Sequence, residues 1–487
     1  MSDSTSTTTD PRRHDLPIIH REPSVMHAAV TILGLACWIS FGIFYLKSGL
    51  HGILLLGLVW VAANCMPLRC NYLQIREAMQ IGMDRAMPAM FIFLMIGVVI
   101  ATFILSGTVG SLIYYGLKFM HPAVFLPAGL ILCSIMSLAV GTSWGTVATG
   151  GVVLIGVGGA MGIPLPIVAG MIISGASFGD KMSPVSDTTN LAAVSADTNL
   201  YAHIKSMSYT TGPSYLIALV AFSWIGMSFA EQSLPKAELE VLLNGLDATF
   251  TINVFMLLPL IVLLVLSMRA VAAEAAMLVA ALIAALLAIF FQSQGTADVV
   301  TAFYDGAKIS TGIATLDPLL NRGGMIDMVW TFSLSFIAIS LGSVLQQMGF
   351  LKVLMEWLMR QVQRTASLVT SAILTTFAAN MTLGESYISL ILTGQMFKQK
   401  FNEQGVDRAV LSRSLEEGGT LMTALIPWTT TGAFYAATLG VATLDYAQWT
   451  ILNWVNPLMG IAFAWIGLAI FRATKEEPAE TEPAESR

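Results

Sequence analysis

Long apolar stretches recur along this sequence of 487 residues, and short polar segments separate them. The first stretch, residues 28–46, is long enough to cross the roughly 30 Å hydrocarbon core of a bilayer as a helix. No small-residue cleavage site follows it, so we expect a retained helix and not a signal peptide. Charged residues make up only 11% of the chain, whereas soluble domains carry about 25%. The sequence therefore predicts an all-α polytopic membrane protein whose main surroundings are the lipid bilayer.

Two groups of apolar stretches, near residues 140–190 and 380–440, are too short to span a membrane alone. Each group contains a proline near hydroxyl-bearing residues, Pro184 in SPVSDTT and Pro427 in PWTTT. Proline lacks the amide hydrogen that a helix needs and clashes with the preceding turn. The backbone groups freed by such a break must be buried in protein or line a watery cavity. We therefore predict discontinuous helices at both places.

Three motifs occur twice, in the same order and at a nearly constant spacing. The spacing is 243 residues for the first two pairs and 241 residues for the third. The pairs are VGTSW (140–144) with LGESY (383–387), PVSDT (184–188) with PWTTT (427–431), and AFSWIG (221–226) with AFAWIG (462–467). One such pair could arise by chance, but three pairs in order indicate an internal repeat.

The charges of the polar segments predict how the two copies cross the membrane, because cytoplasmic loops are enriched in Lys and Arg. Segments 67–87 and 350–365 are basic, as is the N-terminal segment, whereas segments 231–250 and 292–326 are mainly acidic. We therefore expect both termini in the cytoplasm and the two copies in opposite orientations. Inverted repeats with interrupted helices are typical of secondary transporters, whose substrate site lies where the breaks meet.

The predicted organisation has a terminal segment at each end and four parts between them. The parts are a cytoplasmic N-terminal segment (1–27), a peripheral transmembrane hairpin (28–87), inverted repeat 1 (88–230), a linker with transmembrane helices (231–330), inverted repeat 2 (331–473) and a disordered cytoplasmic tail (474–487). The tail is charged and rich in proline, a composition that cannot form a packed core.

The breaks offer oxygen-bearing side chains without His or Cys, a set that suits Na⁺ or Li⁺ better than a transition metal. The candidate ion-binding residues are Thr142, Ser143, Ser186, Asp187 and Thr188 in the first copy, and Asn380, Glu385, Ser386, Thr429 and Thr430 in the second. Asp180 and Lys181 form either a local ion pair or part of an ion pathway. Glu416 and Glu417 belong either to the membrane interface or to the site, and His203 is expected at the interface.

Asp187 is the predicted centre of this site and the expected ligand of Na⁺. An ionised carboxylate near the centre of a membrane costs about 2.5–3.5 kcal/mol on insertion scales. The site then has two accessible states, a protonated acid or an ionised acid that holds a metal cation. Because these states exclude each other, competition at one carboxylate would produce exchange. The alternative is that Asp187 and Thr188 only cap a helix, since SDTT is a good capping pattern.

Three longer motifs closely resemble the NhaC family of Na⁺/H⁺ antiporters over residues 28–472. They are GTSWGT, SGASFGDKMSPVSDTTNLAA and SRSLEEGGTLMTALIPWTTTGAFYAATLGV. The resemblance implies the fold of the ion transporter superfamily in a bacterial cytoplasmic membrane, with scaffold and transport domains, two re-entrant hairpins and a homodimer.

Relatives in that superfamily bind Na⁺ at Ser-Asn-Thr tips of the two hairpins. Residues 186–188 look like such a tip with Asp in place of Asn, which adds a titratable group. Residues 429–431 depart from the pattern, in which an asparagine often follows the Pro-Trp pair. The family also includes exchangers of malate and lactate. Lys181 is taken as the only basic residue within the motifs, which favours simple cation exchange.

These observations predict a secondary transporter that exchanges Na⁺, or Li⁺, for H⁺. The alternative is an exchanger of a small organic acid or amino acid that is coupled to Na⁺ and H⁺. The motifs contain no nucleophile–base pair and no metal cluster, so we do not expect an enzyme. The transported Na⁺ and H⁺ are the only ions required, no cofactor is expected, and the lack of a long basic stretch argues against a nucleic-acid partner.

Overall fold

The computed structural model describes residues 21–119, 121–184, 186–230, 236–269, 271–313 and 316–472. Over these residues the regular elements are helices, apart from one isolated antiparallel bridge between Val406 and Arg472. Eight helices in this part of the chain are long and apolar enough to cross a membrane, and a pair bent by 83° could add a ninth. The prediction of an all-α polytopic protein is confirmed. The predicted tail (474–487) and most of the N-terminal segment lie outside the described residues.

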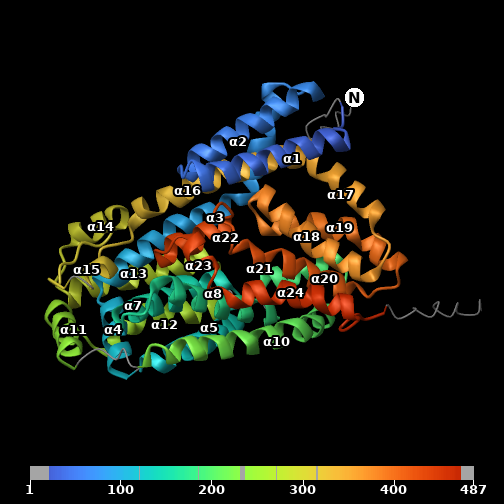
Figure 1. The fold of residues 1–487 in the computed structure, drawn as a ribbon. Helices are drawn as coiled ribbons and strands as arrows, with labels where there is room; N and C mark the ends of the chain where they lie inside the picture. Colours follow the sequence, from blue (N-terminus) through green and yellow to red (C-terminus); the bar gives the residue numbers. More distant parts are fainter. Residues whose placement is uncertain are drawn as a thin grey trace, which may run out of the picture. The chain divides into compact units, whose positions relative to one another are not determined.

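The helices follow one another with short connections (Figure 1). In chain order they are α1 (Val25–Ser40), α2 (Leu50–Cys65), α3 (Tyr72–Leu105), α4 (Thr108–Phe119), α5 (Pro122–Val140), α6 (Ser143–Thr146), α7 (Val152–Ala160), α8 (Leu165–Met182), α9 (Asp187–Ala196), α10 (Leu200–Met227), α11 (Lys236–Thr249), α12 (Leu258–Met268), α13 (Ala273–Phe291), α14 (Thr296–Asp305), α15 (Asp317–Leu320), α16 (Gly324–Gln347), α17 (Phe350–Gln361), α18 (Thr365–Leu383), α19 (Ser386–Glu403), α20 (Arg408–Gly418), α21 (Thr420–Thr423), α22 (Thr430–Leu439), α23 (Thr443–Ala447) and α24 (Ile451–Ile466).

The chain divides into two compact units, and α3 and α16 contribute residues to both. The smaller unit contains the described residues up to 86 together with residues 336–357. Within it, the indole nitrogens of Trp38 and Trp60 donate across the α1–α2 hairpin to backbone carbonyls 2.8 and 2.9 Å away. The predicted loop at 67–87 is mostly wrong, because α3 starts at Tyr72 and continues through Pro88. Its arginines are good helix formers, so their charge marked an extension of a membrane helix and not a loop.

The larger unit contains residues 87–335 and 358–472, and its helix bounds repeat at the spacing of the sequence motifs. Helices α5 (122–140) and α18 (365–383) start 243 positions apart (365 − 122) and end 243 positions apart. Helices α9 (187–196) and α22 (430–439) also match at both ends (430 − 187 = 243). The first residues of α6 and α19, of α8 and α20, and of α10 and α23 follow the same offset. The local structure thus supports the internal repeat, while the opposite orientation of its two copies stays a prediction.

Each copy contains one proline-bearing break followed by a helix of 10 residues. In the first copy, Ser186 caps α9 and accepts a hydrogen bond from the amide of the third residue beyond it, at 3.4 Å. Thr429 does the same for α22 at 3.1 Å. Pro184 and Pro427 lie in the two breaks, as predicted.

Helices of the two copies pack against one another throughout the larger unit. Helix α9 contacts α19 and α20, and α8 contacts α24. In Figure 1, α10 (green) runs beside α24 (red), in agreement with their contacts. The breaks of one copy therefore lie among helices of the other, which allows both copies to contribute to one site.

Candidate functional site

Asp180 lies in the last turn of α8, just before the first break, and hydroxyl groups hold both of its oxygens. Its Oδ1 accepts a hydrogen bond from Ser186 at 2.6 Å, and its Oδ2 accepts one from Ser143 at 2.8 Å. Ser186 is in place because it caps α9, and Ser143 because it is the first residue of α6. The three side chains therefore meet where two helix starts face the end of a third.

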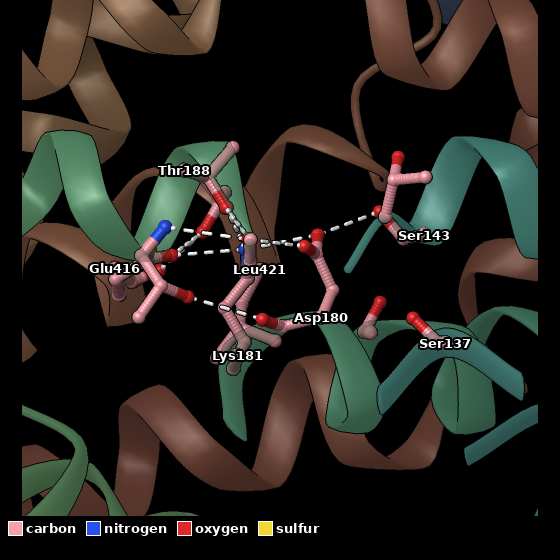
Figure 2. Close-up of polar contacts among 12 residues, drawn as sticks. Ser137, Ser143, Asp180, Lys181, Thr188, Glu416 and Leu421 are labelled. Atoms are coloured by element: carbon pink, nitrogen blue, oxygen red, sulfur yellow. Dashed lines mark hydrogen bonds and ion pairs between the residues drawn. The ribbon is translucent and has the colours of Figure 1, made fainter. Parts of the chain in front are cut away.

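Lys181 places its ammonium group among three oxygens from three different helices. The Nζ atom lies 3.2 Å from Asp180 Oδ2 and 3.0 Å from Glu416 Oε2, and it donates to Thr188 Oγ1 at 2.8 Å. Figure 2 shows Lys181 between Glu416 and Asp180, with Asp180 joined to Ser143. An ammonium group has three hydrogens to donate, so this arrangement uses all of them.

The charges of this cluster do not balance. Asp180, Lys181 and Glu416 are each at most 4% exposed, and they bring two carboxylates to one ammonium group. Breaking the balance of a buried ion pair is strongly destabilising, because an uncompensated charge has lost its hydration. If Glu416 and Lys181 compensate each other, Asp180 carries the surplus negative charge. One proton or one small cation would neutralise it.

Asp187 is the first residue of α9, and its predicted role as the ligand of Na⁺ stays a prediction. Its side chain is exposed, and its Oδ1 accepts a hydrogen bond from the amide of Thr188 at 2.8 Å. The physical reason is helix phase: Ser186 is the cap that faces inward, and the next residue is turned by about 100° around the helix axis. The capping alternative is wrong in detail, because Ser186 is the cap and Asp187 is the first residue of α9.

The second copy brings its own acid close to Asp187. Glu385, at the start of α19, is buried and accepts hydrogen bonds from the Tyr387 amide and the Thr430 hydroxyl, both at 3.0 Å. The hydroxyl of Tyr387 donates to Asp187. Asp187 therefore links the two copies, since it contacts the first cluster through Thr188 and the second copy through Tyr387.

The remaining candidates stabilise backbone at the breaks. Thr429 donates to the carbonyl of Thr423 at 2.7 Å, and Asn380 donates to the carbonyl of Gly419 at 2.6 Å. The Oδ1 atom of Asn380 has no partner among the described residues. Thr142 is half-buried and caps α6 without a side-chain hydrogen bond, and Ser386 is the buried first residue of α19. In the described part of the chain, none of these four side chains forms a hydrogen bond with Asp180.

The sequence left Glu416 and Glu417 between the membrane interface and the site, placed His203 at the interface and overlooked Arg413. Glu416, Glu417 and His203 are fully buried in protein, and Glu416 pairs with Lys181, which favours the site for Glu416. Arg413 is also fully buried. It lies in the third motif, which begins SRSLEEGG, so Lys181 is not the only basic residue within the three motifs. The sequence contained a signal for this ion pair, because Arg413 and Glu417 are four residues apart on one helix and are therefore neighbours on its surface.

No group of three His, Cys, Asp or Glu side chains in the described part of the chain could hold a metal ion. The oxygen set around Asp180 is instead a mixture of carboxylate and hydroxyl groups. Such a set is suited to a weakly held monovalent cation that must bind and leave.

Comparisons with known proteins identify the family of this chain. Residues 175–468 match the model of the family described as "Na+/H+ antiporter family". The chain is 37% identical to the malate-2H(+)/Na(+)-lactate antiporter of Bacillus subtilis over 84% of this chain and 86% of that protein. It is 36% identical to the Na(+)/H(+) antiporter NhaC of Alkalihalophilus pseudofirmus over 88% of this chain and 92% of that protein. It is 29% identical to the arginine/ornithine antiporter ArcD of Halobacterium salinarum over 97% of this chain and 98% of that protein.

Proposed function

Because the chain belongs to the Na⁺/H⁺ antiporter family, in which NhaC-type proteins are its relatives, we propose that it exchanges Na⁺ for H⁺ across the cytoplasmic membrane. It is a multi-pass membrane transporter and not an enzyme. The observation that carries the proposal is the charge of the buried cluster: two carboxylates, one ammonium group and, among the described residues, no further base paired with them. That surplus of one negative charge is what a proton and a sodium ion would compete to neutralise.

Asp180 is the group at which the two ions exclude each other. When it is ionised, its oxygens and the hydroxyls of Ser143 and Ser186 form a set of hard ligands for Na⁺. When it is protonated, the carboxyl group is neutral and holds no metal ion. Only one of the two ions can be bound at a time, so net movement of Na⁺ in one direction requires H⁺ to move in the other.

Asp187, Glu385 and Thr430 form the approach to this site in our proposal. The exposed carboxylate of Asp187 attracts cations and is one hydrogen bond away from the Asp180 cluster through Thr188. Its bond with Tyr387 attaches it to the second copy, next to Glu385. A movement of one copy against the other would therefore change the surroundings of Asp187 first.

The second candidate function is the exchange of a small organic acid or amino acid coupled to Na⁺ and H⁺. It is favoured by the malate/lactate and arginine/ornithine antiporters among the relatives. It would need a base that is free to bind a carboxylate. Lys181 is already shared by two carboxylates, and Arg413 Nε lies 3.6 Å from Glu417, so the contacts favour simple cation exchange.

Purified protein in liposomes with an internal pH-sensitive dye tests both functions. We expect NaCl, and LiCl to a degree to be measured, to drive proton movement, while malate, lactate and arginine do not. Asp180→Asn should reduce the sodium-driven proton flux by about tenfold or more, an effect of at least about 1.4 kcal/mol. Asp445→Asn, an exposed acid on α23, is the matched control and should leave the flux unchanged. An Asp180→Asn protein that exchanges at the wild-type rate would exclude Asp180 from this role.

Three expectations from the sequence remain predictions within this proposal. They are the opposite orientation of the two copies, the cytoplasmic location of both termini, and the homodimer. Labelling of single cysteines placed in the polar segments from each side of the membrane would determine orientation. Mass measurement of the purified protein in detergent would determine the oligomeric state.

A further inference from the structure

A second buried polar cluster lies on the other side of α20 from Lys181. Helices α10, α20 and α24 pack against one another, and each contributes to it. Its main members are His203 and Ser206 from α10, Arg413 and Glu417 from α20, and Asn456 from α24, all fully buried. We call these five residues the α20 column. None of them contacts Asp180 directly, so the exchange proposed above leaves them without a role.

Some atoms of the α20 column form hydrogen bonds that fix the positions of their side chains. His203 Nδ1 and Ser412 Oγ are 2.6 Å apart, and Asn456 Nδ2 donates to Thr211 Oγ1 at 2.8 Å. Arg413 Nη1 donates to the carbonyl of Ala469 at 3.0 Å, beyond the end of α24. The column is therefore an ordered arrangement of side chains.

Other atoms of the same side chains have no hydrogen-bond partner among the described residues. Four of them, His203 Nε2, Ser206 Oγ, Arg413 Nη2 and Asn456 Oδ1, also make no ion pair there, whereas Arg413 Nε and Glu417 Oε1 form an ion pair at 3.6 Å. Buried polar atoms in folded proteins are almost always hydrogen-bonded, if not to protein then to ordered water. So many unpartnered atoms at one three-helix junction indicate a row of bound water molecules.

A glycine on α24 makes room for the acid of this column. A Cβ atom on Gly460 would clash with both oxygens of Glu417, so the carboxylate lies directly against the backbone of α24. The charged group that pairs with Glu417 is Arg413 on its own helix, and His203 on α10 contacts Ser412, the residue before Arg413. The sequence of α24 contains no titratable residue.

The α20 column extends from Glu417 on α20, next to Glu416, to His203 in the first turn of α10. Positions 203 to 211 of α10 cover about 12 Å at the helical rise of about 1.5 Å per residue. At the inner end, Glu417 follows Glu416, which binds Lys181. At the outer end, Arg413 reaches the backbone that follows α24.

We propose that the α20 column is a hydrated path by which protons reach the Asp180–Lys181–Glu416 cluster, separate from the approach of Na⁺ past Asp187. This inference rests on the proposed exchange of Na⁺ for H⁺. Glu417 accepts a proton from water on one side and returns it to water on the other, so no charge is left in the column. The guanidinium group of Arg413 repels a metal cation from the same path. Proton and cation would thus enter from different sides and meet only at Asp180.

The Glu417→Gln variant tests the proton path separately from the binding of Na⁺. Two transport reactions can be measured on the same preparation of this variant. Exchange of external Na⁺ for internal radioactive Na⁺ needs no proton, whereas sodium-driven dye quenching does. We expect Glu417→Gln to retain Na⁺/Na⁺ exchange within about twofold and to lose at least about tenfold in proton flux, or about 1.4 kcal/mol. Glu417→Asp keeps an acid in place and should retain proton flux.

Two outcomes would overturn the inference while leaving the proposed function intact. One is wild-type proton flux in Glu417→Gln when Asp180→Asn abolishes it. The other is loss of Na⁺/Na⁺ exchange together with proton flux in correctly folded Glu417→Gln, which would place Glu417 in the cation site. Wild-type exchange in Asp180→Asn would instead contradict the proposed function.

Hydroxyl-radical labelling of the wild-type protein tests the water row without any substitution. Radicals formed by radiolysis of bound water oxidise the side chains next to it. We expect His203 to be oxidised and Met171, which is fully buried on α8 against Gly129, to be spared. A His203 as unreactive as Met171 would mean that the junction is dry and would overturn the path.

Discussion

Replacing Lys181 by methionine tests the charge balance at the centre of the site. The substitution keeps an unbranched side chain of four heavy atoms and removes the charged nitrogen, which leaves Asp180 and Glu416 buried without the ammonium group. The cluster would then carry two negative charges in place of one. We expect the protein to become less stable, and to regain stability when either protons or sodium ions neutralise the acids.

The distances give the size of the effect. At 3.0 and 3.2 Å, each carboxylate attracts the ammonium group by about 5 kcal/mol at an effective dielectric constant of about 20. The desolvation of the three groups offsets much of this attraction. Measurements on other buried pairs place the loss on removing one partner at about 3–5 kcal/mol. We adopt that range for Lys181→Met.

The assay is thermal unfolding of detergent-solubilised protein at pH 8 and pH 5.5, each with and without NaCl. We expect the deficit of Lys181→Met to be largest at pH 8 without Na⁺ and to shrink on acidification or on addition of Na⁺, since a bound ligand stabilises the folded state. The double variant Lys181→Met/Glu416→Gln restores a single surplus charge. It should recover most of the lost stability, because removing both partners of a buried pair is far less damaging than removing one.

Two results would refute this reasoning. An equal deficit under all four conditions would mean that the acids bind neither ion. A double variant that is as unstable as the sum of the single variants would mean that Lys181 and Glu416 do not interact energetically.

Further predictions concern positions away from the ion cluster, all measured by thermal unfolding in detergent. Gly179→Ala places a methyl group against the backbone of α5 and should cost about 1–3 kcal/mol, whereas Gly212→Ala enters open space and should gain about 0.4–1 kcal/mol. Arg322→Gln removes a guanidinium group from the carbonyls that end α22 and should cost about 1–2 kcal/mol. Lys398, 2.6 Å away, holds the pKa of Asp197 below its usual range, so their pairing stabilises the folded state above about pH 3.9 and is lost as the pH falls through the lowered pKa. Asp197→Asn should therefore unfold earlier than the wild type at pH 7, and the difference should shrink in acid; a difference that grows in acid would contradict the assignment.

The parts of the fold that were predictable depend on local signals. Runs of apolar residues give the membrane-spanning helices, and Pro184 and Pro427 give the breaks, because both effects act within a few residues of the chain. The spacing of 243 residues predicted an internal repeat, and the helix bounds follow the same spacing. The prediction of a loop at 67–87 was wrong because charge alone does not distinguish a loop from a polar extension of a membrane helix.

The site was harder to predict because it depends on which way each side chain faces. Asp187 follows Pro184 and hydroxyl residues in a motif that looks like an ion-binding tip, yet the capping role of Ser186 turns it outward. Glu416 and Glu417 differ by about 100° around α20, so one faces Lys181 and the other faces Arg413 and α24. The sequence shows two adjacent acids, but their different partners follow only from the packing of the helices around α20.

The repeat gives both copies the same backbone and different charges. At the offset of 243, Asp187 corresponds to Thr430, and Glu385 corresponds to Thr142 (430 − 187 and 385 − 142). Each equivalent pair therefore supplies one acid and one hydroxyl group. A symmetric chain would place acids at both members of a pair, and like charges that share one site repel each other.

The same asymmetry explains why Asp180 has no counterpart. Its equivalent in the second copy is Thr423, and the equivalent of Lys181 is Ala424 (423 − 180 and 424 − 181). The second copy thus repeats the proline break without the acid–base pair that precedes it in the first. In place of that pair, the second copy contributes Glu416, whose charge compensates Lys181 and leaves Asp180 as the surplus acid. One surplus acid between two matching breaks is what a carrier needs if each cycle is to move either a proton or a cation, and never both.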